Sequence, residues 1–123
     1  MKSNAFQLLS AAALALVTIG SPALAGDAAK GAALVQARCT VCHSPEAGQG
    51  PDLTGVVGRK AGTAPGFPAS AALKGSGVVW TPTDLDAFLA DPSKRVPGTA
   101  MPNPYVNAAD RADIVAYLAT LKP

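Results

Sequence analysis

The sequence predicts an all-α domain in which three main helices are joined by long loops. Three segments space their apolar residues three or four apart, as on one face of a helix, and each follows a residue type that commonly caps helices. Sustained alternation of apolar and polar residues, which would indicate a strand, is missing from the sequence. Many of the 12 glycines and 11 prolines lie between the three segments, where they favour turns and irregular loops.

The first two predicted helices are defined by their caps and their apolar faces. The first begins near Asp27, a suitable N-cap, and directs Leu34 and Val35 toward the core. The second follows Thr81 and ends before Asp91–Pro92. Its first turn contains Pro82 and Asp84, and its apolar residues are Leu85, Phe88 and Leu89.

The third predicted helix starts after Asn107 and has Asp110 in its first turn. Its apolar face consists of Ile114, Val115, Tyr117, Leu118 and Leu121. The loops between the three helices are long for such a small domain, and they have little protein core to pack against. This imbalance indicates that the loops pack on a bound cofactor.

The N-terminal segment has the pattern of an export signal. Lys2 supplies a positive charge, residues 6–19 are largely apolar, and residues 23–25 read Ala-Leu-Ala, a typical cleavage site. We therefore predict a signal peptide over residues 1–25, a single domain over residues 26–123, and a periplasmic location. The alternative is that the apolar stretch stays uncleaved as a membrane anchor, although it is short for a spanning helix, which needs about 20 residues.

The run Cys39-Thr40-Val41-Cys42-His43 predicts the cofactor. Two thiols three residues apart share a face of a helical turn, so both can form thioethers with a haem, and His43 can then bind the iron. A disulfide or redox-active pair would leave His43 without a role. A zinc site would need more ligands than two cysteines and one histidine. We predict one haem c, attached through Cys39 and Cys42.

Composition narrows the choice of the second axial ligand. His43 is the only histidine, and Met101 is the only methionine after residue 25. Met101 lies in a loop with Pro97, Pro102 and Pro104, whose rings restrict the backbone and can hold a weak thioether ligand in place. A His/Met pair is typical of an electron-transfer haem. The alternative is that Met101 only fills a gap in the core.

The charge balance excludes a nucleic-acid partner. After removal of Lys2, nine of the ten basic residues remain against eight acidic ones. Such a chain lacks the strong positive field that nucleic-acid binding requires. Aromatic residues make up only 5% of the sequence, so the protein core alone should be weak and folding should depend on the haem.

In its motifs the sequence resembles the class I cytochrome c family, within the branch of mitochondrial cytochrome c and bacterial cytochrome c2. The resemblance covers essentially the whole chain after residue 25. The residues that carry it are Gly26-Asp27, Lys30-Gly31, the Cys39–His43 run, Gly50-Pro51-Asp52-Leu53, Gly58-Arg59-Lys60, Ala64-Pro65-Gly66-Phe67, Trp80, Pro97-Gly98-Thr99-Ala100-Met101 and Arg111 to Leu118.

This resemblance implies the small cytochrome c fold, with its loops wrapped around one haem, and it implies roles for further residues. The carbonyl of Pro51 is expected to accept a hydrogen bond from the imidazole of His43. Arg59 and Trp80 are expected to donate hydrogen bonds to a haem propionate. The alternatives are an ordinary turn proline at Pro51, a solvated surface role for Arg59 and simple core packing for Trp80.

Other positions bear on helix packing and on docking. By the same resemblance, Gly31 lets the first and last helices cross closely beside Tyr117. Ser93 and Ala100 stand where the family often has lysine, which thins the ring of positive charge around the haem edge. The basic residues that could still form a small patch there are Arg38, Lys94 and Arg95.

Taken together, these features predict a soluble, periplasmic one-electron carrier that is not an enzyme and is monomeric. Its expected partners are membrane-bound or periplasmic redox proteins such as a quinol-cytochrome c oxidoreductase, a terminal oxidase or a photosynthetic reaction centre. One alternative is a haem enzyme or gas sensor with a displaceable sixth ligand. Another is a membrane-tethered electron-transfer module.

Overall fold

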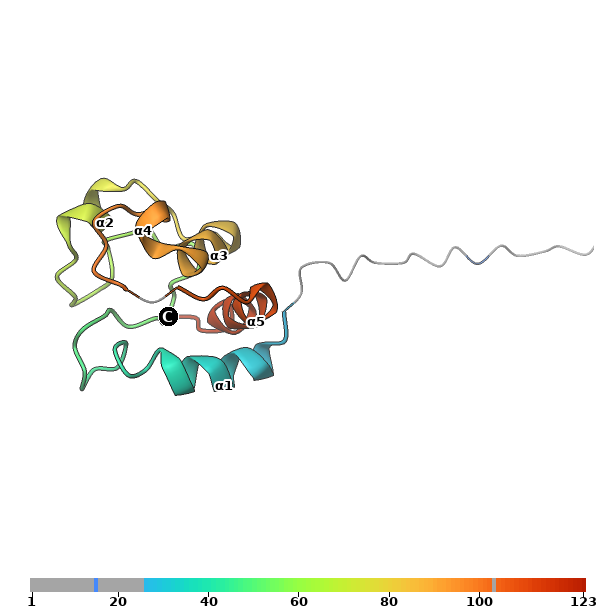
Figure 1. Cartoon of the computed structure of the whole chain (residues 1–123). Coiled ribbons are helices and arrows are strands. Elements are labelled where there is room, and N and C mark those ends of the chain that lie inside the picture. The colour runs from blue at the N-terminus through green and yellow to red at the C-terminus, as the bar shows by residue number, and fades with distance from the viewer. Residues whose placement is uncertain (1–14, 16–25, 103) are drawn as a thin grey trace, which may run out of the picture.

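The computed structural model describes residues 26–102 and 104–123, together with residue 15. It contains α1 (Ala28–Arg38), α2 (Ala71–Gly75), α3 (Pro82–Ala90), α4 (Pro92–Arg95) and α5 (Ala108–Leu118). α1 and α5 pack against each other, and α5 also contacts α3 (Figure 1). Within the described residues there is no extended strand, only an isolated antiparallel bridge between Lys60 and Val79. The all-α prediction is confirmed, and the predicted signal peptide lies outside the described residues.

The three predicted helices begin at the predicted caps. The side chain of Asp27 accepts hydrogen bonds from the first backbone N–H groups of α1. Thr81 caps α3 through the backbone N–H of Asp84, and Asn107 caps α5 through that of Asp110. Each cap satisfies a backbone donor that the helix itself cannot satisfy. Among these described helices, none is long and apolar enough to cross a membrane.

Two short helices, α2 and α4, were not predicted from the sequence. α2 has five residues and α4 has four, so neither is long enough to show helical periodicity. Asp91 ends α3 and also caps α4, which explains why Asp91–Pro92 looks like a simple helix stop. Leu121 was predicted to lie on the third helix, but α5 ends before it. Leu121 nevertheless packs against the core.

Glycines allow the close crossing of α1 and α5. A Cβ at Gly31 would lie 1.9 Å from the carbonyl oxygen of Asp113 and 2.9 Å from Cβ of Tyr117. A hydrogen bond also links the start of α1 to α5, since the backbone N–H of Asp27 donates to Oδ1 of Asp113 at 2.7 Å. Gly31 is therefore required by contact with backbone atoms, which cannot move aside as a flexible side chain can.

Gly31→Ala should destabilise the protein by about 3 kcal/mol or more, because its methyl group must push α5 away from α1. The matched control is Gly75→Ala in α2, where a Cβ would meet nothing within 4 Å. That change should be neutral or stabilising by up to about 1 kcal/mol, since alanine favours helices. Urea unfolding of the holoproteins measures both effects. Equal stabilities for the two variants would contradict the close crossing.

The segment between α2 and α3 leads back to the first long loop and positions Trp80. The backbone N–H of Trp80 donates to the carbonyl of Arg59 at 2.9 Å, and that of Gly58 donates to the carbonyl of Trp80 at 2.8 Å. The Trp80 ring is buried and packs on Phe88 of α3, with ring centroids 4.9 Å apart. Trp80 thus joins the long loop to the core.

Candidate functional site

The turn that carries the two cysteines continues directly from α1. The backbone N–H of Cys39 donates to the carbonyl of Val35 at 2.8 Å, and that of His43 donates to the carbonyl of Cys39 at 2.8 Å. The second bond is helical in spacing, so the two cysteines occupy one helical turn. The two cysteines do not form a disulfide with each other, both are partly exposed, and Cys39 packs against the hydrophobic core.

The imidazole of His43 is oriented by the next loop. Its Nδ1 lies 2.8 Å from the carbonyl oxygen of Pro51, which is the contact that the family resemblance implies. Because a carbonyl only accepts, Nδ1 carries the proton and the lone pair of Nε2 stays available for a metal. A Cβ at Gly50 would lie 2.6 Å from Cε1 of His43, so this glycine lets the loop approach the ring.

Met101 lies in an irregular segment between α4 and α5, which we call the Met101 loop (residues 96–107, of which residue 103 is not described). The Met101 side chain is partly buried and packs against the same core cluster as Cys39 and Trp80. Its backbone N–H donates to Oγ1 of Thr99 at 3.4 Å. Further along the loop, the backbone N–H of Tyr105 donates to the carbonyl of Leu89 in α3 at 2.7 Å.

Tyr105 connects the Met101 loop to the cysteine-bearing turn. The guanidinium carbon of Arg38 lies 5.9 Å from the centre of the Tyr105 ring, a cation–π distance. Burial raises the pKa of the Cys39 thiol, while neighbouring Tyr105 and Arg38 act in the opposite direction. Burial, together with the proximity of Cys39, also raises the pKa of Tyr105. The contact between Tyr105 and Arg38 places the end of the Met101 loop beside the cysteine-bearing turn.

The two predicted propionate ligands are positioned differently. Trp80 is buried and packs on Phe88. Arg59 is partly buried and donates to the carbonyls of Thr54 and Asp52, each at 3.0 Å. Burial lowers the pKa of Arg59, and the nearby carboxylate of Asp52 opposes that shift. Arg59 is therefore held by its own loop, with further N–H groups left to bind an anion.

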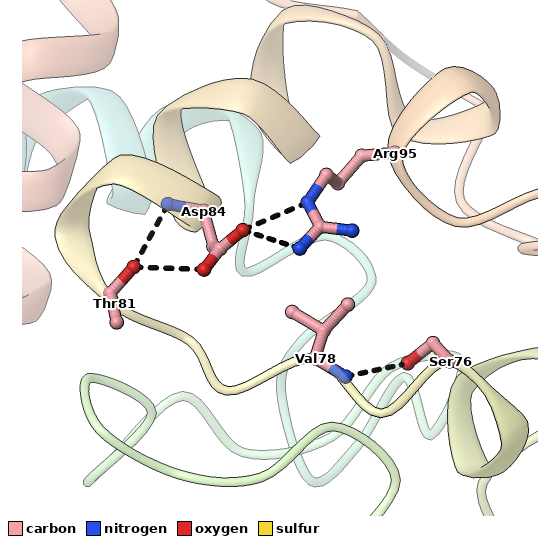
Figure 2. Close-up of polar contacts among 5 residues, drawn as sticks. All are labelled: Ser76, Val78, Thr81, Asp84 and Arg95. Carbon is pink, nitrogen blue, oxygen red and sulfur yellow. Dashed lines mark hydrogen bonds and ion pairs between the residues drawn. The ribbon is translucent and has the colours of Figure 1, made fainter.

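The predicted basic patch is smaller than the sequence indicates. Nε and Nη2 of Arg95 donate to Oδ1 of Asp84 at 2.9 and 2.5 Å, and Asp84 also accepts from the hydroxyl of Thr81 (Figure 2). The Arg95 contact, followed by the Thr81 contact, lowers the pKa of the Asp84 carboxyl. Lys94 is exposed, and Arg38 lies at Tyr105. Of the three residues in the predicted patch, Arg95 therefore has its charge offset by Asp84.

Sequence reasoning assigned no role to Gly50, Tyr105 or Arg111, which the structure places in contact with the site or its loop. Gly50 and Arg111 stand within the motifs that carry the family resemblance, so position in a motif was the available signal. For Tyr105 the sequence offers no signal, because its neighbours Arg38 and Cys39 are distant along the chain.

The chemistry of this donor set fits a covalently bound haem. Two free thiols share one turn, an imidazole has its Nε2 available, and a thioether side chain packs on the same core. Several apolar side chains that pack against that core are only partly buried by the protein, among them Leu34, Leu53, Val57, Leu73, Tyr105 and Leu121. Such side chains suit contact with the apolar face of a macrocycle.

Comparisons with known proteins agree with this chemistry. The family model described as cytochrome c matches residues 28–122. The chain is 46% identical over 101 residues to cytochrome c of Euglena viridis, covering 79% of this chain and 99% of that protein. It is also 46% identical over 101 residues to cytochrome c2 of Rhodopila globiformis, covering 79% of this chain and 95% of that protein.

A solved structure extends the likeness to the fold. Cytochrome cH from Methylobacterium extorquens superposes with a TM-score of 0.72 at 49% identity, covering 77% of this chain and 99% of that one. The sequence match and the structural match therefore agree on one family, and the small cytochrome c fold is confirmed. This chain belongs to the cytochrome c family and carries one haem c, attached covalently through Cys39 and Cys42.

Proposed function

We propose that the protein is a one-electron carrier in which His43 and Met101 bind the haem iron. The observation that carries this proposal is the hydrogen bond that orients the His43 imidazole, together with the packing of the Met101 side chain on the core. The Pro51 carbonyl directs Nε2 of His43 away from the loop, and the Met101 side chain packs on the same core as Cys39. When bound, the haem supplies a reversible couple between Fe(III) and Fe(II).

The residues around the proposed ligands favour electron transfer over bond chemistry. The hydrogen bond from His43 to Pro51 fixes the imidazole in one orientation and increases its basicity as a ligand. The tied Met101 loop keeps the thioether near its binding position, which limits access by water or substrate. In the proposal, Trp80 and Arg59 donate N–H groups to the propionates and compensate for their partial burial. We therefore do not propose an enzymatic activity.

Two other functions would use the same fold. A haem enzyme or gas sensor needs a sixth position that is open or readily vacated. A membrane-tethered electron-transfer module needs an N-terminal anchor. The contacts that hold the Met101 loop to α3 disfavour the first alternative. The second depends on residues 1–25, which lie outside the described part of the chain.

Carbon monoxide distinguishes the carrier from the enzyme or sensor. For a carrier, the ferrous holoprotein should bind CO slowly and weakly, because Met101 must first leave the iron. The same sample should accept and return one electron per haem in a potentiometric titration, and reoxidation should restore the original ferric spectrum. Fast CO binding to a five-coordinate ferrous haem would exclude the carrier proposal in favour of the alternative.

We further propose that residues 1–25 are a cleaved signal peptide, that residues 26–123 form the mature domain, and that the protein acts in the periplasm. The basic, apolar and Ala-Leu-Ala segments support this, as does the similarity to bacterial cytochromes c2 and cH. Mass spectrometry of the exported holoprotein should give a chain that starts at Gly26. A full-length chain retained in membranes would instead support the tethered module.

The proposed partners are redox proteins that exchange single electrons with a small carrier, such as a quinol-cytochrome c oxidoreductase, a terminal oxidase or a reaction centre. The pairing of Arg95 with Asp84 removes one positive charge from the small basic patch expected at the haem edge, which weakens steering there. Contact should therefore rest largely on apolar surface, including the exposed side chains of Val41 and Val106. Electron transfer to a candidate partner should consequently depend only weakly on salt, whereas a steep dependence would contradict this docking mode.

A further inference from the structure

Arg111 links the end of the Met101 loop to two helices. Its Nε donates to Oδ1 of Asp86 in α3 at 2.8 Å. Its Nη1 donates to the carbonyl oxygens of Tyr105 at 2.7 Å and Val106 at 2.9 Å. The Arg111 side chain is only 13% exposed, whereas that of Asp86 is 48% exposed. The bonds to Asp86 and to the Tyr105 carbonyl are partly buried, and the bond to the Val106 carbonyl lies at the surface.

The two bonded carbonyls are one anchor of the segment that carries Met101. Tyr105 follows Met101 by four residues, and its backbone N–H is also bonded, to Leu89 of α3. The opposite anchor is Val96, which is 1% exposed and belongs to the core. Between Val96 and Tyr105 the described backbone makes only local hydrogen bonds. The position of Met101 therefore depends on how firmly the two ends are held.

Arg95 offers a contrast within the same region. Its ion pair with Asp84 joins α4 to α3, as Figure 2 shows. In the described contacts, Arg95 donates to this carboxylate and to no carbonyl of the Met101 loop. Its side chain is 34% exposed. Both arginines thus pair with an aspartate of α3, but only Arg111 also bonds to the loop.

We propose that Arg111 is a positioning residue for Met101 and that it sets the resistance of the haem site to external ligands. This inference rests on the proposed binding of Met101 to the iron. Without Arg111, the segment free to move extends toward Asn107, the N-cap of α5, and detached forms of the loop become more populated. An external ligand that binds only the detached form gains apparent affinity in proportion to that population.

Imidazole is a suitable probe, because it binds haem iron and can do so here only after Met101 has left. The ferric holoprotein is titrated with imidazole while the far-red sulfur-to-iron charge-transfer band is followed. Arg111→Gln should raise the apparent affinity for imidazole about tenfold or more, the factor expected for the loss of a charged hydrogen bond. Arg111→Lys, which keeps the charge but lacks the planar fork, should give an intermediate increase.

Arg95→Gln is the matched control, because it removes an arginine–aspartate pair on the same helix without touching a loop carbonyl. It should leave imidazole affinity within about twofold of the original protein. Urea unfolding followed by far-ultraviolet circular dichroism separates local from global effects. If the two variants lose similar amounts of global stability, Arg111→Gln should still raise imidazole affinity by a larger factor than Arg95→Gln does.

Three results would overturn the inference. In the first, Arg111→Gln and Arg95→Gln raise imidazole affinity equally. In the second, Arg111→Gln and Arg111→Lys both leave it unchanged while the original protein shows the charge-transfer band; the ligation proposal then stands and only the role of Arg111 fails. In the third, the original protein lacks the band, which removes Met101 as ligand and the role of Arg111 with it. If Arg111→Gln does not fold, Arg111→Lys decides.

Discussion

Replacing both haem-attaching cysteines, as Cys39→Ala with Cys42→Ala, is expected to abolish the folded state of the domain. Among the residues that the structure describes, the buried core has only 12 hydrophobic side chains, and just two of the larger ones, Ile114 and Val96, are less than 2% exposed. A domain of this size is only marginally stabilised by its protein core, with a total of about 5 kcal/mol or less. The haem packs against the remaining apolar side chains, so the stability lost with it should exceed that margin.

The measurement is far-ultraviolet circular dichroism of the exported chain, followed by urea titration. The double variant should show little helical signal and no cooperative transition. Val41→Ala is the matched control, because Val41 lies between the two cysteines with its side chain 68% exposed. That variant should retain the haem, the helical signal and the original transition. A cooperative, helical protein without attached haem would refute the dependence of folding on the cofactor.

Met101→Ala should remove the far-red charge-transfer band of the ferric protein and lower its midpoint potential. A thioether stabilises the ferrous state, so its replacement by water or another ligand favours the ferric state. We expect a fall on the order of 0.1 to 0.3 V, a part of the range of about 0.8 V over which axial ligands tune haem. Optical spectra and a potentiometric titration of the same sample measure both changes.

The control for this variant is Val106→Ala in the same loop. The side chain of Val106 is 83% exposed, whereas its carbonyl accepts the hydrogen bond from Arg111 and is kept in the variant. Val106→Ala should preserve both the band and the potential. If Met101→Ala retains the band, the sixth ligand is another residue, and Met101 has the packing role that the sequence also allowed.

Much of the fold could be predicted because its signals are local. Asp27, Thr81 and Asn107 each bond to backbone N–H groups two or three residues away, so a short stretch of sequence is enough to recognise a helix start. The haem attachment turn is local in the same sense, since five consecutive residues supply both thiols and the imidazole. The short helices α2 and α4 lack such a signal because each spans about one turn.

The sequence by itself therefore determined the cofactor, the family and the three main helices, because motif spacing and helix caps act between near neighbours. The resemblance also anticipated the helix crossing at Gly31 and the contact between His43 and Pro51, whereas only the tertiary structure decided which side chains hold the Met101 loop and its flanking helices. Arg95 is paired with Asp84, the ring of Tyr105 lies at Arg38, and Arg111 bonds to the end of the Met101 loop. These contacts depend on how the helices cross. α1 and α5 can cross closely because Gly31 has no Cβ, which would otherwise meet the backbone of Asp113. Such geometry arises from packing the whole chain into one core, and no short segment encodes it alone.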